Sequence, residues 1–250
     1  MRRFIVLAGL VSLGAISQAS DHNNLSKDRP LRFEDAYSGA FRSWEFQAGL
    51  RFDFFDRNRP VYNFRSELQY GFGKNKDISI GFEPLYSTDS GRILGNVTEL
   101  SYFEGVQREI GSSPAIGYRL EAGFPVSGGR GVELKARGIL TKTARHYDKL
   151  HLNLDVSHHT ESNFGERQTR LGLILGYSSP IGYPKRFDDT FLAEIGFEQS
   201  RQVGGGIDGW IGVGLRKQVS PTAVFDFGIQ SDFLRGSGAS RLTLGYSMAF

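Results

Sequence analysis

The sequence predicts an all-β protein, a single transmembrane antiparallel β-barrel of about 12 strands connected as an up-and-down meander. Three observations predict this fold. Apolar and polar residues alternate along many segments, the chain ends on such a segment with an aromatic residue, and no apolar run beyond the N-terminus is long enough for a spanning helix. Alternation gives each strand one apolar and one polar face, and a closed barrel can present every apolar face to lipid.

The first 19 residues are expected to be a signal peptide that is cleaved after export. Met1–Arg3 is basic, Phe4–Ile16 is an apolar run, and Ser17–Ala19 supplies the small residues that a signal peptidase recognises. The apolar run is shorter than the ~20 residues of a spanning helix. The chain contains no cysteine, which excludes a lipoprotein anchor and a disulfide framework.

The remainder divides into two predicted parts. Residues 20–42 are polar and irregular and are expected to form a periplasmic N-terminal lead-in, whereas residues 43–250 are expected to form the barrel. Glycine accounts for 32 of 250 residues, about twice its ordinary share of ~7%, which suits strands with small residues on one face. The formal charge of +3 includes Arg2 and Arg3, so the mature chain is nearly neutral and predicts no nucleic-acid partner.

Alternation begins with Trp44–Phe54, where apolar side chains occupy the even positions and polar or small residues most of the odd ones. About twelve such segments are present, mostly ~10 residues long, the length of a tilted strand that crosses a bilayer. An even number of strands places both termini at the periplasmic end. Longer connections are then expected at the outer end, within residues 87–96, 158–166, 198–206 and 231–240.

The last ten residues, Arg241–Phe250, alternate without interruption. Leu244, Tyr246, Met248 and Phe250 lie on the apolar face, and this ending resembles the C-terminal signal recognised by the outer-membrane barrel assembly machinery of Gram-negative bacteria. A free apolar edge strand would invite aggregation, whereas in a barrel the last strand pairs with the first. The sequence therefore predicts a location in the outer membrane, with membrane lipid and the assembly machinery as partners.

A soluble β-sandwich or a secreted, lipocalin-like barrel is the alternative fold. Such a fold would bury the apolar face of each strand and expose the charged face, and alternation by itself does not separate the two folds. The terminal Phe250, the number of strands and the aromatic residues near strand ends favour the membrane barrel.

In a membrane barrel the polar faces line the lumen, where charged side chains need partners of opposite sign. Neighbouring strands offer such partners. The charges are therefore expected either to fill the lumen with an ion-pair network or to line a narrow aqueous path that selects solutes. The candidate lumen-lining residues are Arg51, Asp53, Arg65, Glu67, Arg119, Glu121, Glu133, Lys135, Arg137, Asp155, Arg170, Glu194, Asp208, Arg216 and Asp226.

The number of strands bears on the width of the lumen. Barrels of ~8 strands are filled by side chains, and those of ~16–18 strands leave an open channel. Twelve lies between these cases and predicts a narrow or gated pore. Luminal glycines are expected to free some of the space, among them Gly117, Gly123, Gly172, Gly212 and Gly214.

A barrel lipid hydrolase is a minor alternative. Enzymes of that class use Ser and His near one strand end, and this chain has His158, His159 and Ser162 close together. Positions three apart on an extended strand face opposite sides, so His159 and Ser162 would need a turn to meet. The adjacent histidines have no third ligand nearby and predict no metal site. We expect no catalytic residue, no metal and no cofactor.

Several segments resemble the family of outer-membrane transporters named for the MetA-pathway of phenol degradation: Arg29–Ala36, Gly39, Trp44–Leu50, Lys149–Leu154 and Leu244–Ser247. The resemblance implies a monomeric barrel that admits small molecules, aromatic compounds among them, and it supplies no catalytic residues. The predicted function is thus a narrow or gated channel or transporter for small solutes. The alternative is a plugged structural or surface-interaction barrel that acts through its external loops.

Overall fold

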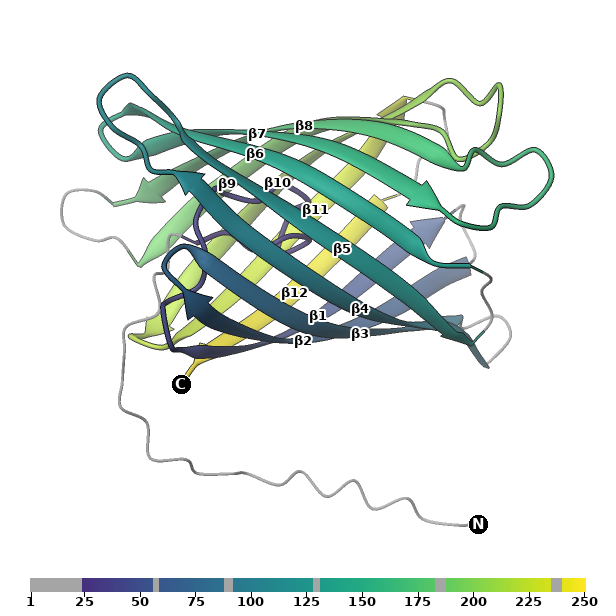
Figure 1. Ribbon diagram of the computed structural model, residues 1–250, viewed down its shortest axis with the longest axis horizontal. Coiled ribbons are helices and arrows are strands. Elements are labelled where there is room, and N and C mark those ends of the chain that lie inside the picture. The colour runs from purple at the N-terminus through teal and green to yellow at the C-terminus, as the bar shows by residue number, and fades with distance from the viewer. Residues whose placement is uncertain (1–23, 56–58, 88–91, 128–130, 183–187, 235–239) are drawn as a thin grey trace, which may run out of the picture.

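The computed structural model describes residues 24–55, 59–87, 92–127, 131–182, 188–234 and 240–250 as one closed antiparallel β-barrel (Figure 1). The predicted signal peptide, residues 1–19, lies outside these ranges, as do parts of the predicted loops 87–96 and 231–240. None of the described residues belongs to a helix long and apolar enough to cross a membrane.

Twelve strands form the wall of the barrel within the described residues. In chain order they are β1 (Trp44–Phe55), β2 (Arg59–Gly73), β3 (Lys76–Ser87), β4 (Arg92–Gln107), β5 (Ala115–Ser127), β6 (Glu133–Arg145), β7 (Asp148–His159), β8 (Thr169–Ile181), β9 (Asp189–Gln199), β10 (Ile207–Ser220), β11 (Ala223–Leu234) and β12 (Ser240–Ala249).

Each strand pairs with its neighbours in the chain, and β12 returns to pair with β1, which confirms the predicted meander. The closing register runs from Glu45 opposite Ala249 to Phe54 opposite Ser240. Beyond the paired strands, the backbone amide of Trp44 donates to the carbonyl of Phe250 at 3.0 Å, and the amide of Phe250 donates back at 2.9 Å. The last strand therefore leaves no free edge between itself and β1.

The alternation in the sequence becomes two faces of the wall. In β10, residues 211, 213 and 215 are exposed apolar side chains, whereas residues 212, 214 and 216 are buried. Aromatic rings pair on the outer face, where the ring centroids of Trp44 and Tyr70 lie 4.6 Å apart and those of Phe225 and Tyr246 lie 5.0 Å apart. The wall thus turns its apolar side chains outward and its polar side chains inward.

The end of the barrel where β1 begins and β12 ends is called the terminal end. Three connections there have two residues each, at 74–75, 146–147 and 221–222, whereas the connection between β4 and β5 spans residues 108–114. At the opposite end the strands extend further than predicted. Residues 92–96 of β4 and residues 158–159 of β7 lie in segments predicted as loops. At β4, register shifts near Leu85 and Asn96 interrupt the alternation.

Residues 24–40, called the inner segment below, lie inside the barrel (Figure 1). This location differs from the periplasmic lead-in expected for residues 20–42. The inner segment enters at the terminal end, turns back within the lumen and leads into β1. It has polar residues between its apolar ones, and both kinds find partners on the inner face of the wall.

The closing register can be tested with cysteine pairs, because the chain has no cysteine of its own. Leu50 lies opposite Leu244 on the outer face. Directly opposed residues have Cβ atoms ~5 Å apart and diagonal ones ~7–8 Å apart, so Leu50→Cys with Leu244→Cys should form a disulfide rapidly under mild oxidation. Leu50→Cys with Leu242→Cys is the offset control. Faster cross-linking of the offset pair, followed by gel mobility without reductant, would contradict this register.

Candidate functional site

Ion pairs join the inner segment to the wall. The ammonium group of Lys27 pairs with Glu121 and, at 3.3 Å, with Glu99, and the guanidinium group of Arg29 pairs with Asp226. All five side chains are buried or nearly so. Buried charges of this kind are stable only when they are paired and hydrogen-bonded, so the inner segment and the wall neutralise one another.

Two further pairs have the opposite polarity, with an acid on the inner segment and an arginine on the wall. Asp28 lies 3.2 Å from Arg65. Glu34 accepts a hydrogen bond of 2.7 Å from the Nε atom of Arg119, whose Nη1 atom donates to Ser101 at 2.8 Å. Pairs of both polarities fix the segment in one position, because a shift along the barrel axis would separate several pairs at once.

Side chains of the wall also satisfy the backbone of the inner segment. The Oε2 atom of Glu194 accepts from the amides of Arg32 and Phe33 at 2.8 and 3.0 Å. Asn153 accepts from the amide of Glu34 at 2.7 Å and donates to its carbonyl at 2.9 Å. Thr141 accepts from the amide of Ala36 at 3.0 Å. An irregular buried segment lacks the backbone hydrogen bonds that neighbouring strands give one another, and these side-chain hydrogen bonds take their place.

Asp35 joins the two arms of the inner segment. Its carboxylate accepts from the amides of Leu25 at 2.9 Å and Tyr37 at 3.2 Å, and its own amide donates to the carbonyl of Leu25 at 3.3 Å. Burial raises the pKa of the Asp35 carboxyl to about 7, while the Lys149 ammonium and the two amides act in the opposite direction. These hydrogen bonds join the beginning of the inner segment to its end and hold the segment as a compact loop.

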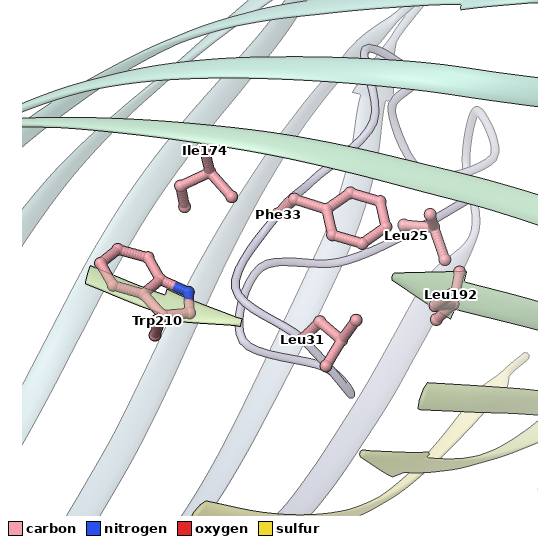
Figure 2. Close-up of a cluster of buried hydrophobic side chains, with 6 residues drawn as sticks. All are labelled: Leu25, Leu31, Phe33, Ile174, Leu192 and Trp210. Carbon is pink, nitrogen blue, oxygen red and sulfur yellow. The ribbon is translucent and has the colours of Figure 1, made fainter. Parts of the chain in front are cut away.

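Apolar contacts complete the docking. Leu25, Leu31 and Phe33 of the inner segment pack with the wall residues Ile174, Leu192 and Trp210 in one buried cluster (Figure 2). The wall contributes inward-facing apolar residues here, against the general alternation. A second cluster lies around Ala36 and includes Phe103, Ala115 and Ile139. The hydrophobic core of this barrel is thus the interface between the wall and its own N-terminal segment.

Glycines of the wall provide the space for the segment. A Cβ atom at Gly176 would lie 2.5 Å from the ring of Phe33, and one at Gly228 would lie 2.6 Å from the carbonyl oxygen of Pro30. Gly212 and Gly214, predicted to widen the lumen, face Leu31 and Pro30 in the same way. Only residues without a side chain allow the inner segment to approach the wall this closely.

A cavity of about 740 Å³ lies between the inner segment and the opposite end of the barrel. Its lining contains eight cationic and seven acidic side chains, so its charge is mixed and nearly balanced. The cations are Lys27, Arg32, Arg51, Lys135, Arg137, Arg170, Arg201 and Arg241, and the acids are Asp28, Glu83, Glu99, Glu121, Glu133, Asp155 and Glu198. Its volume is within the ~300–1,000 Å³ typical of small-molecule sites.

The structure divides the candidate lumen-lining residues into groups. Seven line the cavity: Arg51, Glu121, Glu133, Lys135, Arg137, Asp155 and Arg170. Five outside that lining contact the inner segment: Arg65, Arg119, Glu194, Arg216 and Asp226. Asp53 and Glu67 pair with wall arginines, and Asp208 is half-buried opposite Glu198. The predicted ion-pair network therefore includes the N-terminal segment as well as neighbouring strands.

Several important residues were not among the candidates. Glu99 could have been found, since it lies next to the apolar Leu100 and alternation then places it on the polar face. Phe103 and His151 could not, because an inward aromatic ring has no evident role until the inner segment is placed. The ring of His151 lies 4.9 Å from that of Phe33, and its nitrogens lie 3.0 Å from Thr141 and Ser178.

The residues considered for lipid hydrolysis are separated. His158 hydrogen-bonds to Thr169 at 3.0 Å on one face of β7, and His159 lies 3.3 Å from Glu133 on the other. Ser162 is exposed in the following connection. Within the described ranges no hydrogen bond joins Ser162 to either histidine, so these three residues do not form a nucleophile and base pair.

The fold resembles solved outer-membrane barrels. An outer-membrane channel from Pseudomonas putida F1 superposes with a TM-score of 0.63 at 10% identity, covering 88% of this chain and 100% of that one. The NanC porin gives 0.61 at 9% identity, covering 81% and 98%, and the KdgM porin gives 0.55 at 13%, covering 82% and 99%. No family model and no curated protein matches the sequence. The likeness is one of fold.

Two glycine substitutions test whether the inner segment is docked against the wall. Gly228→Leu should expel the inner segment, because the new side chain would occupy the space of Pro30. Gly138→Leu is the control, since a Cβ atom there meets nothing within 4 Å. Trypsin followed by mass spectrometry should show rapid cleavage after Lys27 and Arg32 in the first variant only. Equal resistance of both variants would contradict this docking.

Proposed function

We propose that this protein is a channel of the Gram-negative outer membrane, through which small solutes pass when the inner segment moves aside. The single observation that carries the proposal is the cavity of about 740 Å³, lined by charged side chains inside a wall whose outer face is apolar. A polar lumen inside an apolar belt is the arrangement of membrane β-barrels. The fold shared with porins and an outer-membrane channel supports the same conclusion.

The orientation follows from export and assembly. A cleaved signal peptide at residues 1–19 delivers the chain to the periplasm, and Leu244, Tyr246, Met248 and Phe250 present the C-terminal signal to the barrel assembly machinery. Both termini then face the periplasm, and the cavity faces the outside. The protein acts as a monomer, because the barrel closes on itself and needs no second copy to cover an edge.

The inner segment is the gate in this proposal. It lies between the cavity and the terminal end, and it is held by ion pairs and hydrogen bonds. Polar contacts of this kind can be exchanged for water contacts at small net cost, since a typical hydrogen bond contributes only ~1 kcal/mol net. The apolar cluster around Phe33 provides the larger barrier to movement.

The second candidate function is a plugged barrel that acts through its external loops. It is favoured by one observation, the number of buried contacts that hold the inner segment in place. In that case the segment is a permanent structural element and the cavity is only the outer mouth of a closed barrel. The two candidates differ in whether movement of the inner segment changes conduction.

A reversible disulfide distinguishes them. Ala36 and Thr141 are both buried, with 3.0 Å between the Ala36 amide nitrogen and the Thr141 hydroxyl. Ala36→Cys with Thr141→Cys should therefore lock the segment to the wall. In planar bilayers we expect discrete conductance steps after reduction and a several-fold lower open probability after oxidation, whereas each single-cysteine variant should not respond to oxidant.

One outcome would contradict the channel, and a second would contradict only the gate. If the reduced double variant, the wild type and Gly228→Leu all insert as folded, heat-modifiable protein and none conducts, the plugged barrel is favoured. If all of them conduct equally in both redox states, the protein is a channel but the inner segment is not its gate.

A further inference from the structure

Arg32 differs from the other arginines of the lumen because no acid pairs with it. Among the described residues, no hydrogen bond or ion pair engages its guanidinium group, and its buried Nε atom has no partner. The group instead lies over the indole ring of Trp210, 4.0 Å from the ring centroid. The side chain lines the cavity, so it offers charged hydrogen-bond donors to whatever enters.

The nearest acid cannot take this role. Glu194 already accepts hydrogen bonds on both oxygens, from the amides of Arg32 and Phe33 on Oε2 and from Trp210 and Gln230 on Oε1. These four bonds occupy the lone pairs of one carboxylate. Glu194 therefore holds the backbone of Arg32 in place and leaves its guanidinium group without a hydrogen-bonded partner.

Two more arginines lie at the same part of the cavity. Arg51 and Arg241 share one carboxylate, with Asp53 3.0 Å from the Nε atom of Arg51 and 2.6 Å from that of Arg241. Glu83 adds a longer contact of 3.5 Å to Arg51. Arg241 is close enough to both Arg32 and Arg51 to be repelled by them. Arg51 and Arg241 thus have Asp53 and Glu83 as paired carboxylates. Arg32 has only Glu194 nearby, whose oxygens already accept other hydrogen bonds, so among the described residues its guanidinium donors stay without an acceptor.

We propose that this cavity is a binding site for small organic monocarboxylates, with Arg32 as the residue that pairs with the carboxylate. The planar guanidinium group forms two parallel hydrogen bonds with a carboxylate, and such a ligand would supply the acceptors that the Arg32 guanidinium lacks in the protein. Ile174 and Trp210 lie beside the inner segment at the edge of the same cavity (Figure 2) and are almost fully buried, so the ligand is held mainly through its carboxylate.

The proposal deepens the proposed function, on which it rests, by naming the class of solute. It also makes the inner segment a ligand contact. Arg32 is anchored through its main chain, since its amide donates to Glu194 and its carbonyl accepts from Arg137 at 2.9 Å. The guanidinium group itself lies over the indole ring of Trp210, and this contact sets its position independently of the ligand, as a preformed site requires.

Tryptophan fluorescence tests the site directly. The chain has two tryptophans, Trp44 and Trp210, so Trp44→Phe leaves Trp210 as the only reporter. At constant ionic strength in detergent, benzoate should change the emission of Trp210 in a saturable manner. Benzamide, a neutral molecule of the same shape, should not. Arg32→Gln should weaken benzoate binding by at least about tenfold, as expected for the loss of a charge-assisted pair.

Arg108→Gln is the matched control. Arg108 is exposed, lies outside the cavity lining and donates a hydrogen bond of 3.3 Å to Asn75, so its loss should leave benzoate affinity unchanged within about twofold. Arg241→Gln should weaken binding several-fold through the charge of the cluster, without touching the inner segment. Trypsin resistance of residues 24–40 shows that the segment of Arg32→Gln is still docked.

The proposal is overturned if wild-type protein gives no saturable response to benzoate, if benzamide binds equally well, or if both Arg32→Gln and Arg241→Gln bind benzoate like the wild type. These results are independent of conduction. Saturable benzoate binding by a barrel that never conducts would support the site and refute the channel. Conduction without benzoate binding would refute the site alone.

Discussion

The backbone of the inner segment depends on side chains of the wall for its hydrogen bonds, and this constraint organises the lumen. A chain inside a barrel has no neighbouring strand to pair with, yet its buried amides need partners. Glu194, Asn153 and Thr141 supply them from β9, β7 and β6. The polar inward face of the barrel therefore binds the protein's own residues 24–40 as well as lining the lumen.

Docking of the inner segment explains why the inward face of the wall carries apolar residues and glycines among its polar residues. Apolar side chains occur where the inner segment is apolar, as at Ile174 and Leu192, and glycines occur where its main chain comes close, as at Gly228. Beyond the segment the wall is charged and the cavity begins. The lumen thus has a packed half near the terminal end and a charged, open half toward the other end.

Most of the wall could be predicted from the sequence because alternation at every second residue has only one structural interpretation per strand. The twelve strands follow from it, and the terminal Phe250, the strand number and the aromatic strand ends add the prediction of a barrel that β12 closes on β1. The boundaries of β4 could not be predicted, since register shifts hide the period. The position of the inner segment could not be predicted either, because it has no periodicity. Its contacts depend on several strands brought together only by closure, so Phe103 and His151 gave no signal as docking residues.

Hydrogen exchange at the amides of Phe33, Glu34 and Ala36 measures the docking most directly. Each of these amides donates to a buried wall side chain, so in the folded protein they should exchange as slowly as amides within the strands. A synthetic peptide of residues 24–40 provides the unprotected rate. Exchange of these amides in the intact barrel at the rate of the free peptide would show that the segment does not reside in the lumen, and would contradict both the gate and the anion site.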